Sequence, residues 1–203
     1  MDRTRTTLDA ALRTFRAHGG MLRTAHALEL GIHPETLYRL RDEGEIVEVS
    51  RGLFRLASLP ALSQPDLVAV AARIPSGVIC LVSALSFHGI TTEIPHEVQV
   101  ALPAGSPRRR VRQPPTRVFQ FSGPSFEEGI ETHEVDGVTV RVYGPEKTVA
   151  DCFRFRNKVG LPIAIEALRL CRERKHASVR VLLEFARIDR VERVMMPYLE
   201  AVQ

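Results

Sequence analysis

Residues 23–56 have the spacing of small, turn-forming and apolar residues that two short helices need in order to cross at a tight turn. Ala27 is small enough to let the helices approach closely. Gly31 can adopt the positive φ that the turn requires, and Leu37 has the spacing of a residue buried under the second helix. Further apolar contacts at helical spacing are expected from Leu30, Ile32 and Leu40. The pattern predicts a helix-turn-helix.

The residues after this motif predict a wing. Two runs of strand-forming residues, 46–49 and 53–56, flank the turn sequence Ser50-Arg51-Gly52. A further helix is predicted over residues 4–17, and it ends at His18-Gly19-Gly20. Residues 1–57 are therefore predicted to form a winged helix-turn-helix domain that binds duplex DNA. A small helical unit that docks to proteins and has no DNA role is the alternative.

The second helix of the motif is the predicted recognition helix, whose N-terminal part enters a major groove. If Leu37 and Leu40 face inward, the polar side chains between them face outward. Arg39 can read a guanine through two hydrogen bonds or hold a phosphate, and Glu35 either contacts a cytosine or meets the helix dipole. The predicted DNA-binding residues are His33, Thr36, Tyr38 and Arg39 on the helix, and Arg51 and Arg55 on the wing.

Charge alone does not predict strong DNA binding by this domain. The first 57 residues hold nine Lys and Arg against eight Asp and Glu, so the affinity depends on where the cations are placed. The most concentrated positive charge is elsewhere, in a loop that contains Arg108, Arg109, Arg110 and Arg112. This run is a candidate contact for phosphate or for a partner. The alternative is a solvated loop that keeps a neighbouring strand edge from pairing.

The rest of the chain predicts a second domain of mixed α/β type. Residues 58–66 contain two prolines and are the predicted linker, and the second domain spans residues 67–203. A short helix is expected after an N-cap at Ser83. Strands are expected over 97–102, 117–121, 131–135 and 138–143, and helices over 67–74, 145–155, 163–174, 178–187 and 189–202. The predicted fold class is α+β, with a small sheet and a helical C-terminal part in the second domain.

Residues that could carry chemistry are few and dispersed. Cys80, Cys152 and Cys171 lie in apolar runs and are expected to be buried, reduced thiols. Lys147 and Asp151 are four residues apart on one predicted helix, which suggests a weak surface ion pair. No phosphate-binding loop, zinc-ligand spacing or nucleophile elbow is present. We therefore expect no catalytic residues, no metal, no cofactor and no enzymatic activity.

The location of the protein is expected to be the cytoplasm. No apolar stretch approaches the roughly 20 residues that a membrane span requires. The first 20 residues are charged and amphipathic, and they lack the apolar centre of a signal peptide. The chain is expected to be a monomer or a weak dimer with no membrane partner.

Nearly the whole chain resembles the AbiEi family of antitoxins of type IV toxin–antitoxin systems, which are also transcriptional regulators. In the first domain the resemblance depends on GGMLRTAHALELGI and EVSRGLFRL. In the second it depends on VSALSFHGI, EVQVALP, FEEGIETHEVDGVTVRVYGPEKTVADCF and NKVGLPIAIEALR. The resemblance implies that the winged helix binds repeats in its own promoter. It also implies that the second domain neutralises a nucleotidyltransferase-type toxin.

Position by position, the resemblance assigns the DNA-facing role to Thr36, Tyr38, Arg39 and Arg51. It matches the second-domain signature to Pro145, Glu146, Lys147, Thr148 and Asp151, whose role it leaves open. Two alternatives to an autorepressing antitoxin remain. One is a one-component regulator without a toxin partner, and the other is a nucleic-acid-processing enzyme, which would require clustered carboxylates that the sequence does not show.

Overall fold

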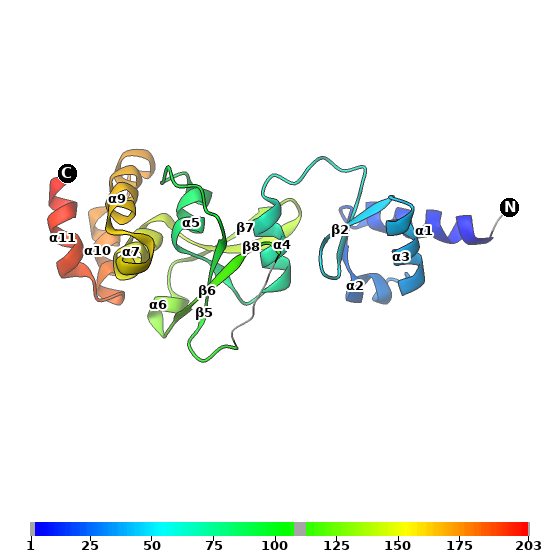
Figure 1. Cartoon of the computed structure of the whole chain (residues 1–203), viewed down its shortest axis with the longest axis horizontal. Coiled ribbons are helices and arrows are strands. Elements are labelled where there is room, and N and C mark those ends of the chain that lie inside the picture. Colours follow the sequence, from blue (N-terminus) through cyan, green and yellow to red (C-terminus); the bar gives the residue numbers. More distant parts are fainter. Residues whose placement is uncertain (1–2, 108–112, 203) are drawn as a thin grey trace. The chain divides into compact units, whose positions relative to one another are not determined.

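The computed structural model describes residues 3–107 and 113–202 and shows a protein of mixed helices and strands (Figure 1). The chain divides into two compact units. The first unit consists of Met1–Arg73 with Glu134–Thr139, and the second of Ile74–His133 with Val140–Gln203. By proximity, residues 67–73 group with the first unit, whereas the predicted second domain begins at residue 67. We retain as a proposal that residues 1–57 form a domain of their own.

The first unit contains the predicted winged helix-turn-helix elements. In chain order they are α1 (Arg3–Ala17), β1 (Met21–Arg23), α2 (Thr24–Glu29), α3 (Pro34–Asp42), β2 (Ile46–Ser50) and β3 (Leu53–Leu56). The three strands form an antiparallel sheet in the order β1-β3-β2. β1 was not predicted, because three residues are too few to show an alternating pattern. Its Leu22 pairs with Phe54 and completes the sheet behind the wing.

The helix-turn-helix has the core that its spacing predicts. Ala27, Leu37 and Leu40 are buried in one apolar cluster with Phe15 of α1. Gly31 has a φ of +82° just after α2. The backbone N–H of Gly31 donates to the Leu28 carbonyl, and the next N–H donates to the Ala27 carbonyl, so the end of α2 is hydrogen-bonded. The predicted turn is therefore confirmed.

Replacing Gly31 with valine is expected to destabilise the first unit by about 1–3 kcal/mol. No described heavy atom lies within 4 Å of the place where a Cβ would be added, so the cost comes from the positive φ. Gly31→Asn is the matched control, because asparagine tolerates this conformation and should cost much less. Urea unfolding of the three proteins measures the difference. Equal midpoints for the wild type and Gly31→Val would contradict this account of the turn.

The second unit is built on a five-stranded sheet in the order β6-β5-β4-β8-β7, of which residues 134–139 around the β7–β8 turn group with the first unit. Its strands are β4 (Val78–Ile79), β5 (Val98–Pro103), β6 (Thr116–Phe121), β7 (Ile130–Val135) and β8 (Val138–Tyr143). β4 pairs antiparallel with β5 and parallel with β8, and β5 pairs parallel with β6. Asp136 and Gly137 both have positive φ, as the predicted two-residue hairpin turn between β7 and β8 requires.

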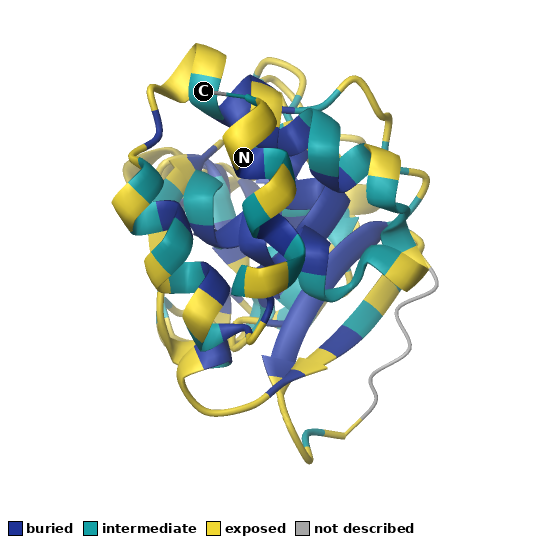
Figure 2. Ribbon diagram, turned by 90° about the vertical axis from the view of Figure 1, so that its left-hand side faces the viewer, coloured by how far each residue is buried: buried dark blue, intermediate teal, exposed yellow. Residues whose placement is uncertain are grey.

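Helices account for most of the remaining chain. They are α4 (Pro65–Arg73), α5 (Leu81–His88), α6 (Pro124–Glu127), α7 (Pro145–Arg154), α8 (Arg156–Val159), α9 (Leu161–Lys175), α10 (Val179–Ile188) and α11 (Glu192–Ala201). Many of these helices alternate between buried and exposed bands, as amphipathic helices do (Figure 2). The expected N-cap at Ser83 is wrong, because the N-cap of α5 is Cys80, three residues earlier. Ser83 is buried and its hydroxyl accepts a hydrogen bond from the Gln99 N–H.

Candidate nucleic-acid interface

The predicted recognition helix, α3, begins with its own cap. The His33 ring nitrogen Nδ1 accepts a hydrogen bond from the backbone N–H of Glu35, and Pro34 occupies the first helical position. Leu37 and Leu40 attach the helix to the core of the first unit. His33 and Glu35 are exposed at its start, as the sequence analysis expected.

The outward position expected for Thr36 is wrong. Its exposed fraction is only 9%, because Thr36 lies one helical turn before Leu40 and shares the inward face of α3. Tyr38, by contrast, is 50% exposed and is one of the few large apolar side chains with so much exposed surface. Thr36 therefore does not belong to the candidate interface, whereas Tyr38 does.

Two arginines of α3 lie beside Tyr38 in sequence, and each is paired with a carboxylate. The side chain of Arg39 is 51% exposed, and its Nε donates to Oε1 of Glu43 over 2.9 Å. Arg41 donates from Nε and Nη2 to Oδ1 of Asp42 over 3.0 and 2.8 Å. The guanidinium carbon of Arg41 also lies 5.1 Å from the centroid of the Tyr38 ring.

Arg41 was not among the predicted contacts, although the sequence carried a signal for it. It follows Tyr38 by three residues, and residues at this spacing are neighbours on a helix surface. The exposed side of α3 therefore presents His33, Tyr38, Arg39 and Arg41. These side chains combine an aromatic ring with fork-shaped donors, a combination suited to base edges and phosphates.

The wing presents one of its two predicted arginines. Arg51 is exposed in the turn between β2 and β3, where Gly52 has a φ of +75°. The Gly52 N–H donates to Oε1 of Glu48, and the Gly52 carbonyl accepts the N–H of Thr24 at the start of α2. These bonds hold the wing tip against the helix-turn-helix, so Arg51 has a defined position.

The predicted DNA contact of Arg55 is wrong. Its exposed fraction is 9%, and its Nη2 donates to the carbonyl oxygen of Pro60 in the predicted linker. Arg55 lies on β3, the central strand of the small sheet, and is paired with Met21 on one side and Val47 on the other. A long side chain on a central strand packs against the neighbouring segment, and here it stabilises the linker.

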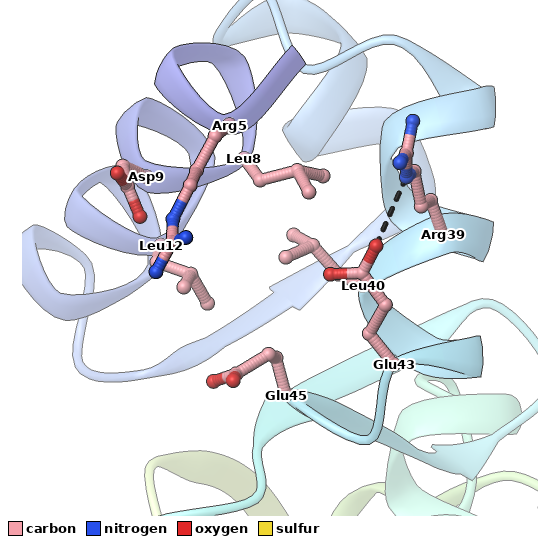
Figure 3. Close-up of a pocket in the computed structure, with 8 residues that line it drawn as sticks. All are labelled: Arg5, Leu8, Asp9, Leu12, Arg39, Leu40, Glu43 and Glu45. Atoms are coloured by element: carbon pink, nitrogen blue, oxygen red, sulfur yellow. Dashed lines mark hydrogen bonds and ion pairs between the residues drawn. The ribbon is translucent and has the colours of Figure 1, made fainter. Parts of the chain in front are cut away.

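A groove of about 310 Å³ lies between α1 and α3 (Figure 3). Its lining consists of Arg5, Leu8, Asp9, Leu12, Arg39, Leu40, Glu43 and Glu45. Three leucines come from the core of the unit, and the charged side chains comprise two arginines and three carboxylates. Because the acids outnumber the bases, the groove does not suit an anion. It shows that Arg39 lies on the flank of α3 that faces α1.

The predicted phosphate or partner contact at Arg108, Arg109, Arg110 and Arg112 lies outside the described residues. It stays a prediction.

Lys147 and Asp151 form a different arrangement from the predicted surface pair. Both side chains have no exposed surface, and Lys147 Nζ donates to Asp151 Oδ1. Nζ also donates to Oδ2 of Asp189 over 3.2 Å. Arg154 Nη1 donates to Asp189 Oδ1 over 3.2 Å and to the hydroxyl of Ser125 over 2.6 Å. The buried charges connect α6, α7 and the end of α10.

The environment of this network is apolar. Nζ of Lys147 lies 4.8 Å from the centroid of the Tyr143 ring and 5.2 Å from that of Phe121. Desolvation by complete burial raises the pKa of Asp151 well above its usual range. The Lys147 ammonium opposes this shift, and the Asp189 carboxylate adds to it. With no exposed surface, Lys147 and Asp151 are out of reach of a substrate in this conformation.

Other features of the described residues concern metal binding, thiol reactivity and membrane insertion. Residues 3–107 and 113–202 contain no group of three His, Cys, Asp or Glu side chains that could hold a metal ion. The three cysteines are buried free thiols, and burial raises the pKa of Cys80 and Cys152 well above the usual range. No helix within those residues is long and apolar enough to cross a membrane.

Among the comparisons with known proteins, the family match falls within the first unit. Residues 9–57 match the family model described as "Transcriptional regulator, AbiEi antitoxin". The comparison with curated proteins gives no match. Among solved structures, the Rv2827c protein of Mycobacterium tuberculosis is similar in fold, with a TM-score of 0.62 and 14% sequence identity. The similarity covers 98% of this chain and 82% of that one.

Proposed function

We propose, starting from the match of residues 9–57 to the AbiEi transcriptional regulators, that this protein is a sequence-specific DNA-binding regulator that represses its own operon. The observation that carries the proposal is the exposed side of α3, where Tyr38, Arg39 and Arg41 lie together on a helix anchored by Leu37 and Leu40. A winged helix-turn-helix inserts this helix into the major groove. Arg51 at the wing tip then contacts the neighbouring backbone.

Arg39 gives the proposal its sharpest test. Replacing Arg39 with alanine should weaken binding to the duplex upstream of the protein's own gene by about 1–3 kcal/mol, because a two-pronged contact to guanine is lost. Fluorescence anisotropy with this duplex and with a scrambled duplex measures the change. Equal losses on both duplexes would assign Arg39 to a phosphate, and no loss on either would remove it from the interface.

Arg169→Ala is the matched control for Arg39→Ala. Arg169 is similarly exposed, at 54%, and it also pairs with a glutamate four residues later, Glu173, over 3.1 Å. It lies on α9 in the second unit. The control loses the same charge and the same type of ion pair, so an equal effect on DNA binding would show that only the net charge matters.

We further propose an antitoxin role, in which the second unit neutralises a nucleotidyltransferase-type toxin without catalysis. The description of the matched family supports an antitoxin, and the burial of Lys147 and Asp151 fits a structural use of these residues. The test is co-expression of the full chain with the product of the neighbouring gene. Growth rescue that survives Arg39→Ala would separate neutralisation from DNA binding, and absence of rescue by the wild type would contradict the antitoxin role.

A further inference from the structure

Two exposed carboxylates, Asp42 and Glu43, lie at the C-terminal end of α3 beside the arginines of the candidate interface. Asp42 is the last residue of α3, and Glu43 follows it as the C-cap. Both are exposed, and each forms an ion pair with one of the two arginines of the candidate interface. The result is that each guanidinium is partly neutralised by a carboxylate before it meets DNA.

The stability of the helix does not explain these two acids. A helix dipole favours negative charge in the first turn and positive charge in the last turn. Glu35 in the first turn follows this rule, whereas Asp42 and Glu43 oppose it. Ion pairs as exposed as these add little to stability. Asp42 and Glu43 therefore call for another explanation, and their position at the DNA-binding helix suggests one.

We propose that Asp42 and Glu43 are specificity-determining residues that weaken the binding of Arg41 and Arg39 to non-specific DNA. The inference rests on the proposed function. On any duplex the paired arginines attract phosphate less strongly than free ones, and the two carboxylates come close to a dense array of phosphates. On the correct site, contacts to base edges offset this cost, but on other sequences nothing does.

The geometry around Arg41 favours base contact over a loose phosphate contact. Its guanidinium is held by Asp42 through two hydrogen bonds and lies 5.1 Å from the Tyr38 ring centroid. A guanidinium held in one orientation loses less conformational freedom when it meets a guanine edge. Residues 1–57 hold nine Lys and Arg against eight Asp and Glu, so their net charge is small. The effect of the two carboxylates on DNA binding is therefore not masked by a large excess of positive charge.

The test replaces each acid by its uncharged isostere in the full chain, as Glu43→Gln and Asp42→Asn. Each variant should bind a scrambled duplex about three- to tenfold more tightly than the wild type, because one repulsive charge is removed and one arginine is released. The ratio of affinities for the upstream and scrambled duplexes should fall. The slope of log K against log salt should become steeper by about 0.9 for each arginine that gains a phosphate.

Glu173→Gln is the matched control for Glu43→Gln. Glu173 pairs with Arg169 at the same spacing, and its side chain is exposed to a similar extent, 53% against 45%. This control should leave both affinities unchanged. An equal gain in Glu173→Gln would show that net charge alone is responsible and would overturn the inference, as would unchanged scrambled-duplex affinity in Glu43→Gln and Asp42→Asn.

The outcome of this test can be separated from that of the proposed function. If the wild type has no preference for the upstream duplex, the proposed regulator role fails, whatever the variants do. If the wild type has this preference and the variants leave scrambled-duplex binding unchanged, only the role of the two acids fails. Thermal melts complete the test, because removing charges that oppose the helix dipole should not lower the melting temperature.

Discussion

Lys147→Ala is expected to destabilise the second unit by about 3–5 kcal/mol, because it leaves the buried Asp151 carboxylate without its cation. Lys147 is fully buried and is bonded to Asp151 and Asp189, which are also fully buried. Asp189 keeps Arg154 as a partner, whereas Asp151 Oδ2 has no hydrogen-bond partner among the described residues. Urea unfolding measures the loss of stability. Faster hydrogen exchange in peptides from α7 assigns this loss to the second unit.

The double variant Lys147→Ala/Asp151→Ala separates charge from packing. Removing both members of the pair leaves no uncompensated Asp151 carboxylate. The double variant should therefore lose clearly less stability than the two single variants lose together. A Lys147→Ala protein of unchanged stability that no longer rescues growth would contradict the structural reading. It would instead indicate a chemical role for the lysine.

Leu37→Ala is expected to destabilise the first unit by about 2–5 kcal/mol and to abolish DNA binding with it. Leu37 is almost completely buried, at 1% exposure, in the cluster that holds α3 against the rest of the unit. Truncation leaves a cavity where the recognition helix is anchored. Hydrogen exchange of α3 peptides should accelerate strongly, and this measurement distinguishes loss of the helix from loss of a DNA contact.

Leu28→Ala provides the comparison for Leu37→Ala. Leu28 lies on α2 of the same motif but is 45% exposed, so the same truncation removes little buried surface and should cost under about 1 kcal/mol. Similar losses for Leu28→Ala and Leu37→Ala would mean that α3 is not packed as the structure shows.

The elements of the fold were largely predictable because their signals are local. The spacing of Ala27, Gly31 and Leu37 identified the helix-turn-helix, and Asp136-Gly137 identified the hairpin turn. The missed elements are short: β1 has three residues, β4 has two, and α6 and α8 have four each. So few residues span too little of a helical or strand period to produce a pattern, and their conformation depends on neighbours distant in sequence.

The candidate interface was only partly predictable. His33, Tyr38, Arg39 and Arg51 are exposed as expected, and their contact with DNA stays a prediction. For Thr36 the error came from treating a polar residue as an outward one, although helical periodicity places it with Leu40. Arg55 was misassigned because the pairing of β3 on both sides became apparent only with β1.

The buried charges of the second unit could not be derived from their spacing. A Lys and an Asp four residues apart usually lie on a helix surface, since charged side chains are almost never fully buried without partners. The decisive partner, Asp189, lies 42 residues after Lys147 at the end of α10. Only the tertiary packing of α7 against α10 brings them together. One available signal was the apolar run around Asp151, which includes Val149, Cys152 and Phe153.

The central claim is that the exposed side of α3 makes this protein a sequence-specific DNA-binding regulator, and competition binding by the full chain tests it most directly. A labelled duplex from the region upstream of the protein's own gene is bound and then challenged with unlabelled scrambled duplex at several salt concentrations. We expect a preference for the upstream duplex of about a thousandfold or more near physiological salt, and an affinity that falls steeply as salt rises. Equal competition by the scrambled duplex at every salt concentration would contradict the claim.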